Sequence, residues 1–151
     1  MAPIAAEFPS RRWFDELVTR ATADTATIER LGTAEFRFGV EVVLPDGTCT
    51  LFGLVLDGYD IDAVGPVGEE GFGPDAVCSG PLEAWTEMIA WIEVNGPADS
   101  AHSLNGLSIA GSPFDVRSAD AMGSDKFYRY MGTLQAVFDA ASETPATVGR
   151  A

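Results

Sequence analysis

The sequence predicts a single domain of the mixed α/β (α+β) class, in which helices cover one sheet. Apolar residues change from helical spacing near the N-terminus to strict alternation in residues 36–44, and return to helical spacing in residues 82–92 and 127–141. A chain of 151 residues has the length of one ordinary domain. Residues 1–8 and 143–151 lack an apolar period, so we expect two loose tails around one domain that spans residues 9–142.

Two helices open the chain. Ser10 is placed to cap the first helix, and Asp24 is placed to cap a shorter one that runs through Leu31 and ends at Gly32. The apolar positions of the first helix recur at helical spacing: Trp13, Phe14, Leu17, Val18 and Ala21. We therefore expect this helix to bury one face.

Three strands follow as an antiparallel meander. Residues 36–44 alternate between apolar and other residues, which predicts a strand with one buried face, and Pro45-Asp46-Gly47 closes it with a turn. Residues 49–64 predict two further strands joined at Asp57-Gly58, a dipeptide suited to a tight hairpin turn. A glycine-rich loop, residues 65–73, leads to a short strand at residues 76–78.

The second half returns to helices. Gly80-Pro81 predicts the start of a helix that ends at Asn95-Gly96. A helical turn at residues 98–104 and a last strand at residues 107–111 precede a final helix over residues 124–141, which Gly132 interrupts. The long helices each carry an apolar stripe: Leu82, Trp85, Met88, Ile89 and Ile92, then Phe127, Tyr130, Met131, Leu134, Phe138 and Ala141.

Charge and composition exclude several classes of function. The 23 acidic residues outnumber the 9 basic ones, and the formal charge of −14 repels nucleic acid and anionic membrane surfaces. No apolar run is long enough for a membrane helix, so we expect no stable membrane insertion. The N-terminus resembles no signal peptide, which favours a cytoplasmic protein. One lysine among the basic residues, with abundant alanine and glycine, suggests a bacterial source.

The polar residues form no catalytic or metal-binding motif. His102 is the only histidine, and Cys49 and Cys78 lie in predicted strands, where we expect both to be small buried side chains. Asp60 and Asp62 fall on the solvent face of a strand, and the loop at residues 65–73 lacks the pattern of a phosphate-binding loop. We expect no metal, no cofactor and no catalytic residue.

Two stretches carry a resemblance to a known family: "DAVCSGPLEAWTEMI" and "ADSAHSLNGLSIAGSPFDV". A short strand, Ser79-Gly80, a helix with Trp85, a helical turn, Gly106 and a strand ending at Gly111 follow in the order found in the sterol carrier protein 2-like lipid-binding domains. The chain resembles this family from about Phe36 to Ala141. Ser112-Pro113-Phe114 departs from the Gly-Asp of many members, and no peroxisomal signal ends the chain.

The resemblance implies a mostly antiparallel five-stranded sheet covered by helices, with an apolar tunnel between them. It also implies lipid carriage without catalysis, for a fatty acid, an acyl-CoA, a sterol-like molecule, a polyketide or a terpenoid. The residues expected to line the tunnel are Phe52, Leu54, Trp85, Met88, Ile89, Phe127, Tyr130, Met131 and Leu134.

Two alternatives stay open at the level of sequence. The same cavity could serve an isomerase, cyclase or hydrolase, which a cavity-facing carboxylate with a strongly raised pKa would favour. The chain could also be an accessory module that docks onto a partner enzyme, which a contiguous exposed apolar patch would favour.

Overall fold

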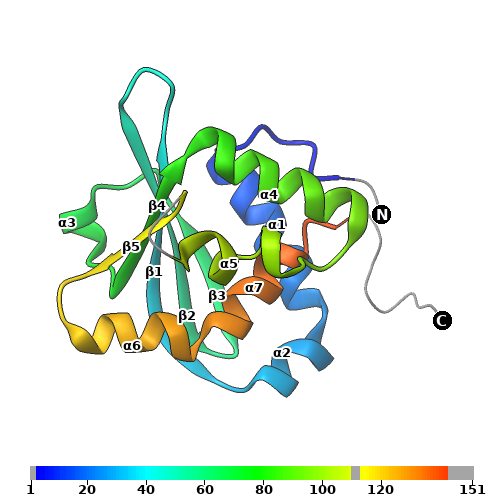
Figure 1. The fold of residues 1–151 in the computed structure, drawn as a ribbon. Helices are drawn as coiled ribbons and strands as arrows, with labels where there is room; N and C mark the ends of the chain where they lie inside the picture. The colour runs from blue at the N-terminus through cyan, green and yellow to red at the C-terminus, as the bar shows by residue number, and fades with distance from the viewer. Residues whose placement is uncertain (1–2, 110–112, 143–151) are drawn as a thin grey trace.

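Five strands form one mixed sheet, and helices cover one of its faces (Figure 1). The computed structural model describes residues 3–109 and 113–142. The strands are β1 (Ala34–Val43), β2 (Cys49–Gly58), β3 (Asp60–Val64), β4 (Ala76–Pro81) and β5 (Asp115–Ser118). Their spatial order is β3-β2-β1-β4-β5, with β1 and β4 parallel and the other neighbours antiparallel. The predicted α+β class and its mostly antiparallel five-stranded sheet are confirmed.

The helices begin and end largely where local signals place them. Within the described residues they are α1 (Arg11–Ala23), α2 (Thr25–Leu31), α3 (Glu69–Phe72), α4 (Leu82–Asn95), α5 (Leu104–Ser108), α6 (Ala121–Arg129), α7 (Met131–Asp139) and the 3-10 turn η1 (Ser100–His102). Both predicted N-caps are confirmed, because Ser10 Oγ accepts from the Trp13 amide at 3.1 Å and Asp24 Oδ1 from the Thr27 amide at 3.2 Å. Gly32 ends α2 with φ of 89°, a conformation that costs glycine little.

The two faces of the sheet differ in polarity. The residues of β1 that face the helices are apolar and buried: Ala34, Phe36, Phe38, Val40 and Val42. On the same face of β2, Leu54 lies opposite Phe38 and Phe52 lies opposite Val40. The alternate residues of β1 include Glu35, Arg37 and Glu41 and lie on the other face. The sheet therefore buries one face in the main core.

Ring contacts show which helices cover the apolar face. Phe14 of α1 stacks on Phe52 with 4.9 Å between ring centroids, and Phe127 of α6 stacks on Phe38 at 5.7 Å. The short helix α3 lies apart from the other helices in Figure 1. Its Phe72 packs over Gly53 on the opposite face, where a Cβ on the glycine would lie 2.6 Å from Cε1 of the Phe72 ring. The layers are thus helices, sheet, and one small helix behind the sheet.

The predicted helix over residues 82–95 is confirmed, and β4 runs into it without a loop. Pro81 ends β4 and is the N-cap of α4, one residue later than predicted. Gly96 follows Asn95 with φ of 94°, and its amide donates to the carbonyl of Ile92. This direct connection sets the direction of α4 relative to the sheet. It thereby determines that the helix face with Trp85 is turned toward the core.

The predicted last strand at residues 107–111 is wrong where the structure describes it. Residues 104–108 form α5, because Ser103 Oγ accepts from the Gly106 amide at 3.0 Å and caps a helical turn. Residues 110 and 111 lie outside the described residues. The fifth strand is instead β5, which pairs with β4 from Asp115 to Ser118.

Three further predictions need correction. The single helix over residues 124–141 is two helices, α6 and α7, separated at Tyr130, whose φ of −100° and ψ of 16° are not helical. The hairpin turn between β2 and β3 lies one residue later than predicted, because Asp57 pairs with Asp60 and Gly58 carries the positive φ. Cys49 is exposed at the start of β2, whereas Cys78 is buried as expected.

The ends of the described chain differ in what they contact. In the predicted N-terminal tail, Ile4 is buried, and the Phe8 ring lies 4.8 Å from the Trp13 ring, centroid to centroid. The predicted C-terminal tail, residues 143–151, lies outside the described residues. Within the described part of the chain, no helix has both the length and the apolar character needed to cross a membrane.

Candidate functional site

Trp85 lies at the centre of the layer between sheet and helices. Its side chain is fully buried, and its indole N–H donates a hydrogen bond of 3.1 Å to the backbone carbonyl of Glu41 in β1. This bond satisfies the one polar group of the side chain and holds the ring against the sheet. The ring centroid lies 4.3 Å from that of Phe114 and 5.8 Å from that of Phe138 in α7. Trp85 therefore joins α4, α7 and the segment before β5.

A second group of rings lies between β1 and α6. Phe36 and Phe38 of β1 are stacked with 5.8 Å between their centroids. Phe127 of α6 stacks on Phe38, and the Tyr130 ring lies 5.9 Å from the Phe36 ring. The break between α6 and α7 therefore falls at a residue that contacts the sheet.

All nine residues predicted to line a tunnel lie in one apolar cluster or pack against it. Seven are buried: Phe52, Leu54, Trp85, Met88, Ile89, Phe127 and Leu134. Tyr130 and Met131 are partly buried. The structure thus brings together side chains from β2, α4, α6 and α7, and their role in ligand binding stays a prediction.

The predicted set omits six aromatic residues that are buried in this cluster: Trp13, Phe14, Phe36, Phe38, Phe114 and Phe138. Phe14 lies on the apolar face of the first helix, and extending the same reasoning to that helix would have included it. Phe114 is fully buried against Trp85 although it stands alone in a polar segment. No periodic signal in the sequence marks Phe114, because only the fold brings it to α4.

The interior holds very few polar side chains. Among the described residues, the buried polar or charged ones are Thr133 and Ser142, both hydroxyl-bearing. No described Lys, Arg, Asp or Glu is buried to that extent. The layer between sheet and helices can therefore desolvate an apolar molecule, and among the described residues it contains no fully buried charged residue, although the Arg20 side chain at the end of α1 is only 11% exposed.

Asp139, at the C-terminal end of α7, is more than a surface carboxylate. Its Oδ1 accepts hydrogen bonds from the Ala98 amide at 3.1 Å and from Gln135 Nε2 at 3.0 Å. The Oε1 atom of Gln135 in turn accepts from the Leu104 amide at 2.8 Å. Burial raises the pKa of Asp139, and these bonds oppose that shift. The contacts give Asp139 a structural role, since they fasten the segment after α4 to α7.

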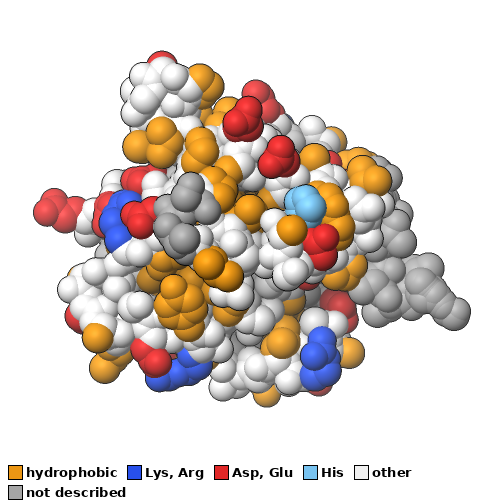
Figure 2. Space-filling view, viewed as in Figure 1, with side chains coloured by type: hydrophobic (Ala, Val, Ile, Leu, Met, Phe, Trp, Pro, Cys, Tyr) orange, Lys and Arg blue, Asp and Glu red, His pale blue; other side chains and the backbone are white. Residues whose placement is uncertain are grey.

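His102 belongs to the same segment and lies at the surface. Its ring stacks on Trp91 with 4.6 Å between centroids, and its Nδ1 lies 2.7 Å from Asp99 Oδ1. The hydrogen bond to His102 is the main cause that lowers the pKa of Asp99. In Figure 2 the pale blue histidine lies beside apolar side chains. Among the described residues, the imidazole thus contacts Trp91 and Asp99.

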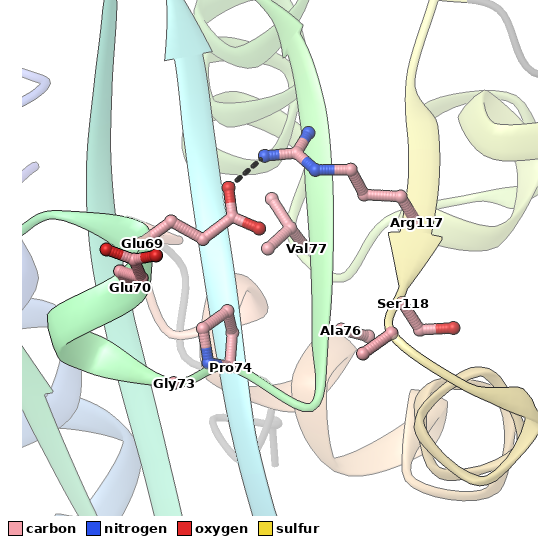
Figure 3. Close-up of a pocket in the computed structure, with 9 residues that line it drawn as sticks. Glu69, Glu70, Gly73, Pro74, Ala76, Val77, Arg117 and Ser118 are labelled. Carbon is pink, nitrogen blue, oxygen red and sulfur yellow. Dashed lines mark hydrogen bonds and ion pairs between the residues drawn. The ribbon is translucent and has the colours of Figure 1, made fainter.

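A shallow depression of about 590 Å³ lies between α3 and β5 (Figure 3). Arg117 of β5 bonds both oxygens of Glu41, at 3.0 and 3.2 Å, and Glu69 of α3 at 2.6 Å. The bond to Arg117 lowers the pKa of Glu41, and the bond to Glu41 raises the pKa of Arg117. Two carboxylates thus neutralise this guanidinium and tie α3 to the sheet, so the depression does not attract anions.

Within the described residues, no cluster of histidine, cysteine, aspartate or glutamate side chains could hold a metal ion. Asp60 and Asp62 are exposed on β3, as predicted. The candidate site is therefore the apolar interior.

Comparisons with known proteins show which solved structures have a similar fold. The sequence matches no protein-family model and no curated protein. A conserved hypothetical protein of Thermus thermophilus, named as a candidate sterol carrier protein, superposes with a TM-score of 0.60 and 14% identity, over 97% of this chain and 98% of its own. The crystal structure of a sterol carrier protein 2 superposes with a TM-score of 0.63 and 14% identity, over 92% of this chain and 100% of its own. The chain therefore has the fold of sterol carrier protein 2.

Proposed function

We propose that the protein binds and carries a hydrophobic small molecule between its sheet and its helices. The observation that carries the proposal is the apolar character of the interior, which is built from aromatic, methionine and aliphatic side chains and contains no fully buried charged residue among the described residues. The fold shared with sterol carrier protein 2 supports the same function. Each methylene group that a ligand buries there contributes about 0.8 kcal/mol.

The ligand would occupy a tunnel lined by the nine predicted residues. The rings of this interior stack on one another, so a bound molecule must move side chains or widen the layer. Met88 and Met131 are suited to this, because a methionine side chain has several rotatable bonds and adapts to irregular volumes. We propose that α4 and α7, which contribute these residues, move relative to the sheet when a ligand binds.

The proposal also covers the location of the protein, its partners and the classes of its ligand. A bacterial cytoplasmic protein of this kind would deliver its cargo to a partner enzyme or would exchange it by brief collision with a membrane. A net charge of −14 opposes lasting adsorption to an anionic surface. Fatty acids, acyl-CoA, sterol-like molecules, polyketides and terpenoids are the ligand classes to compare.

Native mass spectrometry tests the proposal, followed by solvent extraction and mass analysis of any released molecule. Met131→Glu places a charge at a partly buried position of the proposed site, whereas Val94→Glu places the same charge on α4, where the side chain is 74% exposed. We expect bound hydrophobic species in the wild type and in Val94→Glu, and their loss from folded Met131→Glu. Equal occupancy in both variants, or no uptake of any class by the wild type, would contradict the proposal.

A further inference from the structure

We propose that the outer edge of β5 binds an extended segment of a partner protein in which basic and apolar residues alternate, and that this segment adds a sixth strand to the sheet. The inference concerns a protein partner and does not depend on which molecule the interior binds. It rests on the open backbone edge of β5, the apolar side chains beside it and the charges around it.

β5 is the last strand on its side of the sheet, and its outer edge is open in the part of the chain that the structure describes. β4 pairs with one side of β5, from Asp115 to Ser118. The described residues form no other backbone hydrogen bond to this strand. In Figure 3, β5 is the outermost strand in view. The N–H and C=O groups on the free side of such a strand are a template for a further strand.

Large apolar side chains are exposed beside this edge. Ile109, at the end of α5, is 64% exposed, and Tyr128 of α6 is 55% exposed. The Phe114 amide donates to the Leu107 carbonyl and so holds α5 near the start of β5, while the end of β5 leads into α6. Figure 2 shows apolar side chains gathered between α5 and α6. An added strand would cover part of this apolar surface.

The alternation of β5 determines what the added strand presents. Asp115 and Arg117 point to one face of the sheet, and Val116 points to the other face, where it packs against the core. A residue opposite Val116 therefore lies on the side of α5 and α6, where an apolar side chain finds apolar contacts. The residues on either side of it point to the face that carries Asp115. Its partners should accordingly alternate in polarity.

The charges favour basic residues on that second face. Asp115 is exposed and forms no ion pair within the described residues. The Arg117 side chain extends from β5 across Val77 toward Glu69 (Figure 3), where Glu41 and Glu69 neutralise it. A lysine opposite Asp115 would lie about 5 Å from it, Cβ to Cβ. The formal charge of −14 attracts a basic segment and repels a second copy of this chain.

Charge alone does not distinguish the two edges of the sheet, because Asp60 and Asp62 of β3 are exposed as well. The apolar surroundings do distinguish them. The residues of β3 that face the helices, Ile61 and Ala63, are buried, and α1 packs against this strand. The combination of exposed apolar side chains and an open edge therefore favours β5.

The test uses the full chain, labelled with nitrogen-15, and a short capped peptide of alternating lysine and valine. We expect chemical-shift changes in the amides of Asp115–Ser118, Ile109 and Tyr128, together with slower hydrogen exchange in β5. A peptide of the same composition with lysines and valines in separate blocks should bind more weakly, and a peptide with all backbone nitrogens methylated should not bind. Equal binding of the methylated peptide would overturn the inference, because only charge attraction would then remain. No binding of the alternating peptide, or shift changes confined to β3 or to residues around Trp85, would overturn it too.

A pair of charge variants locates the site. Asp115→Lys and Asp60→Lys change the net charge equally at exposed positions on opposite edges of the sheet. We expect Asp115→Lys to weaken binding of the alternating peptide by at least about tenfold and Asp60→Lys by less than about twofold. Equal weakening in both variants would assign the binding to the field of the whole chain and overturn the role of β5. Sedimentation of the wild type alone should show a monomer, and a dimer that Asp115→Lys abolishes would assign this edge to a second copy and overturn the partner proposed.

Discussion

Gly80 is the position at which one added methyl group should disturb the candidate site most directly. It lies on the apolar face of β4, opposite Val42 of β1. A Cβ atom at Gly80 would overlap Cδ1 of Phe114 and lie 2.7 Å from its Cε1. Phe114 is fully buried and its ring centroid lies 4.3 Å from that of Trp85, so an added methyl group must displace the ring against other core side chains. Gly80→Ala therefore forces the packing around Trp85 to change.

The size of the effect follows from two opposing contributions. Overpacking a filled core costs about 1–3 kcal/mol, whereas replacing glycine by alanine restricts the unfolded chain and stabilises the fold by about 0.4–1 kcal/mol. We expect a net loss of roughly 1–2 kcal/mol for Gly80→Ala. For a chain of this length, that loss lowers the melting temperature by about 2–8 °C.

Urea unfolding, followed by circular dichroism and tryptophan fluorescence, measures the change. Gly132→Ala is the matched control, because a Cβ there would lie 3.6 Å from Leu31 Cδ2, an ordinary contact, on an exposed helical residue. The control should be as stable as the wild type or more stable by about 0.5 kcal/mol. A Gly80→Ala protein at least as stable as Gly132→Ala would refute the packing derived for Phe114 and Trp85.

Three further predictions concern other parts of the molecule. Phe72→Ala should destabilise the protein by about 3 kcal/mol in urea unfolding, because it removes the ring that packs over Gly53. The same variant should bind ligand as tightly as the wild type. A large loss of affinity would contradict the placement of the site on the helix-covered face of the sheet. Burial raises the pKa of Asp139 above its ordinary 3.8. The folded state therefore keeps this proton to a higher pH than the unfolded state, and stability falls as the pH rises through that window. As the pH rises from acid to neutral, the free energy of unfolding of Asp139→Asn should therefore increase relative to that of the wild type. A difference between the two proteins that does not change with pH would argue against the raised pKa. A thiol reagent should label exposed Cys49 quickly and Cys78 only on unfolding, because burial raises the pKa of the Cys78 thiol. Rapid labelling of both cysteines in the folded protein would contradict this prediction.

Local signals predicted most of the first half of the fold. The alternation of apolar residues from Phe36 to Val42 indicates a strand with one buried face. The caps at Ser10 and Asp24 are hydrogen bonds to residues three positions later in the chain. Gly96 likewise ends α4 through its own backbone conformation. Each of these features depends on neighbours in sequence, which is why the sequence alone is sufficient to find them.

Features that depend on distant contacts could not be found this way. The strand β5 is short and polar, and its pairing with Val77 and Ser79 of β4 defines it. Tyr130 interrupts an otherwise helical pattern where its ring contacts Phe36. For the site, helix faces identified Trp85, but no periodic signal identified Phe114, because the fold alone brings the two rings together.

The most direct test of a hydrophobic ligand between sheet and helices is isotope-filtered NMR on methyl-labelled protein with unlabelled dodecanol. The account predicts intermolecular NOEs to the methyl groups of Met88, Ile89 and Leu134, which are buried on the helix side. NOEs confined to Leu51, Val64 and Val77 would place the ligand on the opposite face, beside Gly39 and Gly53. That result, or the absence of any intermolecular NOE with dodecanol in excess, would contradict the account.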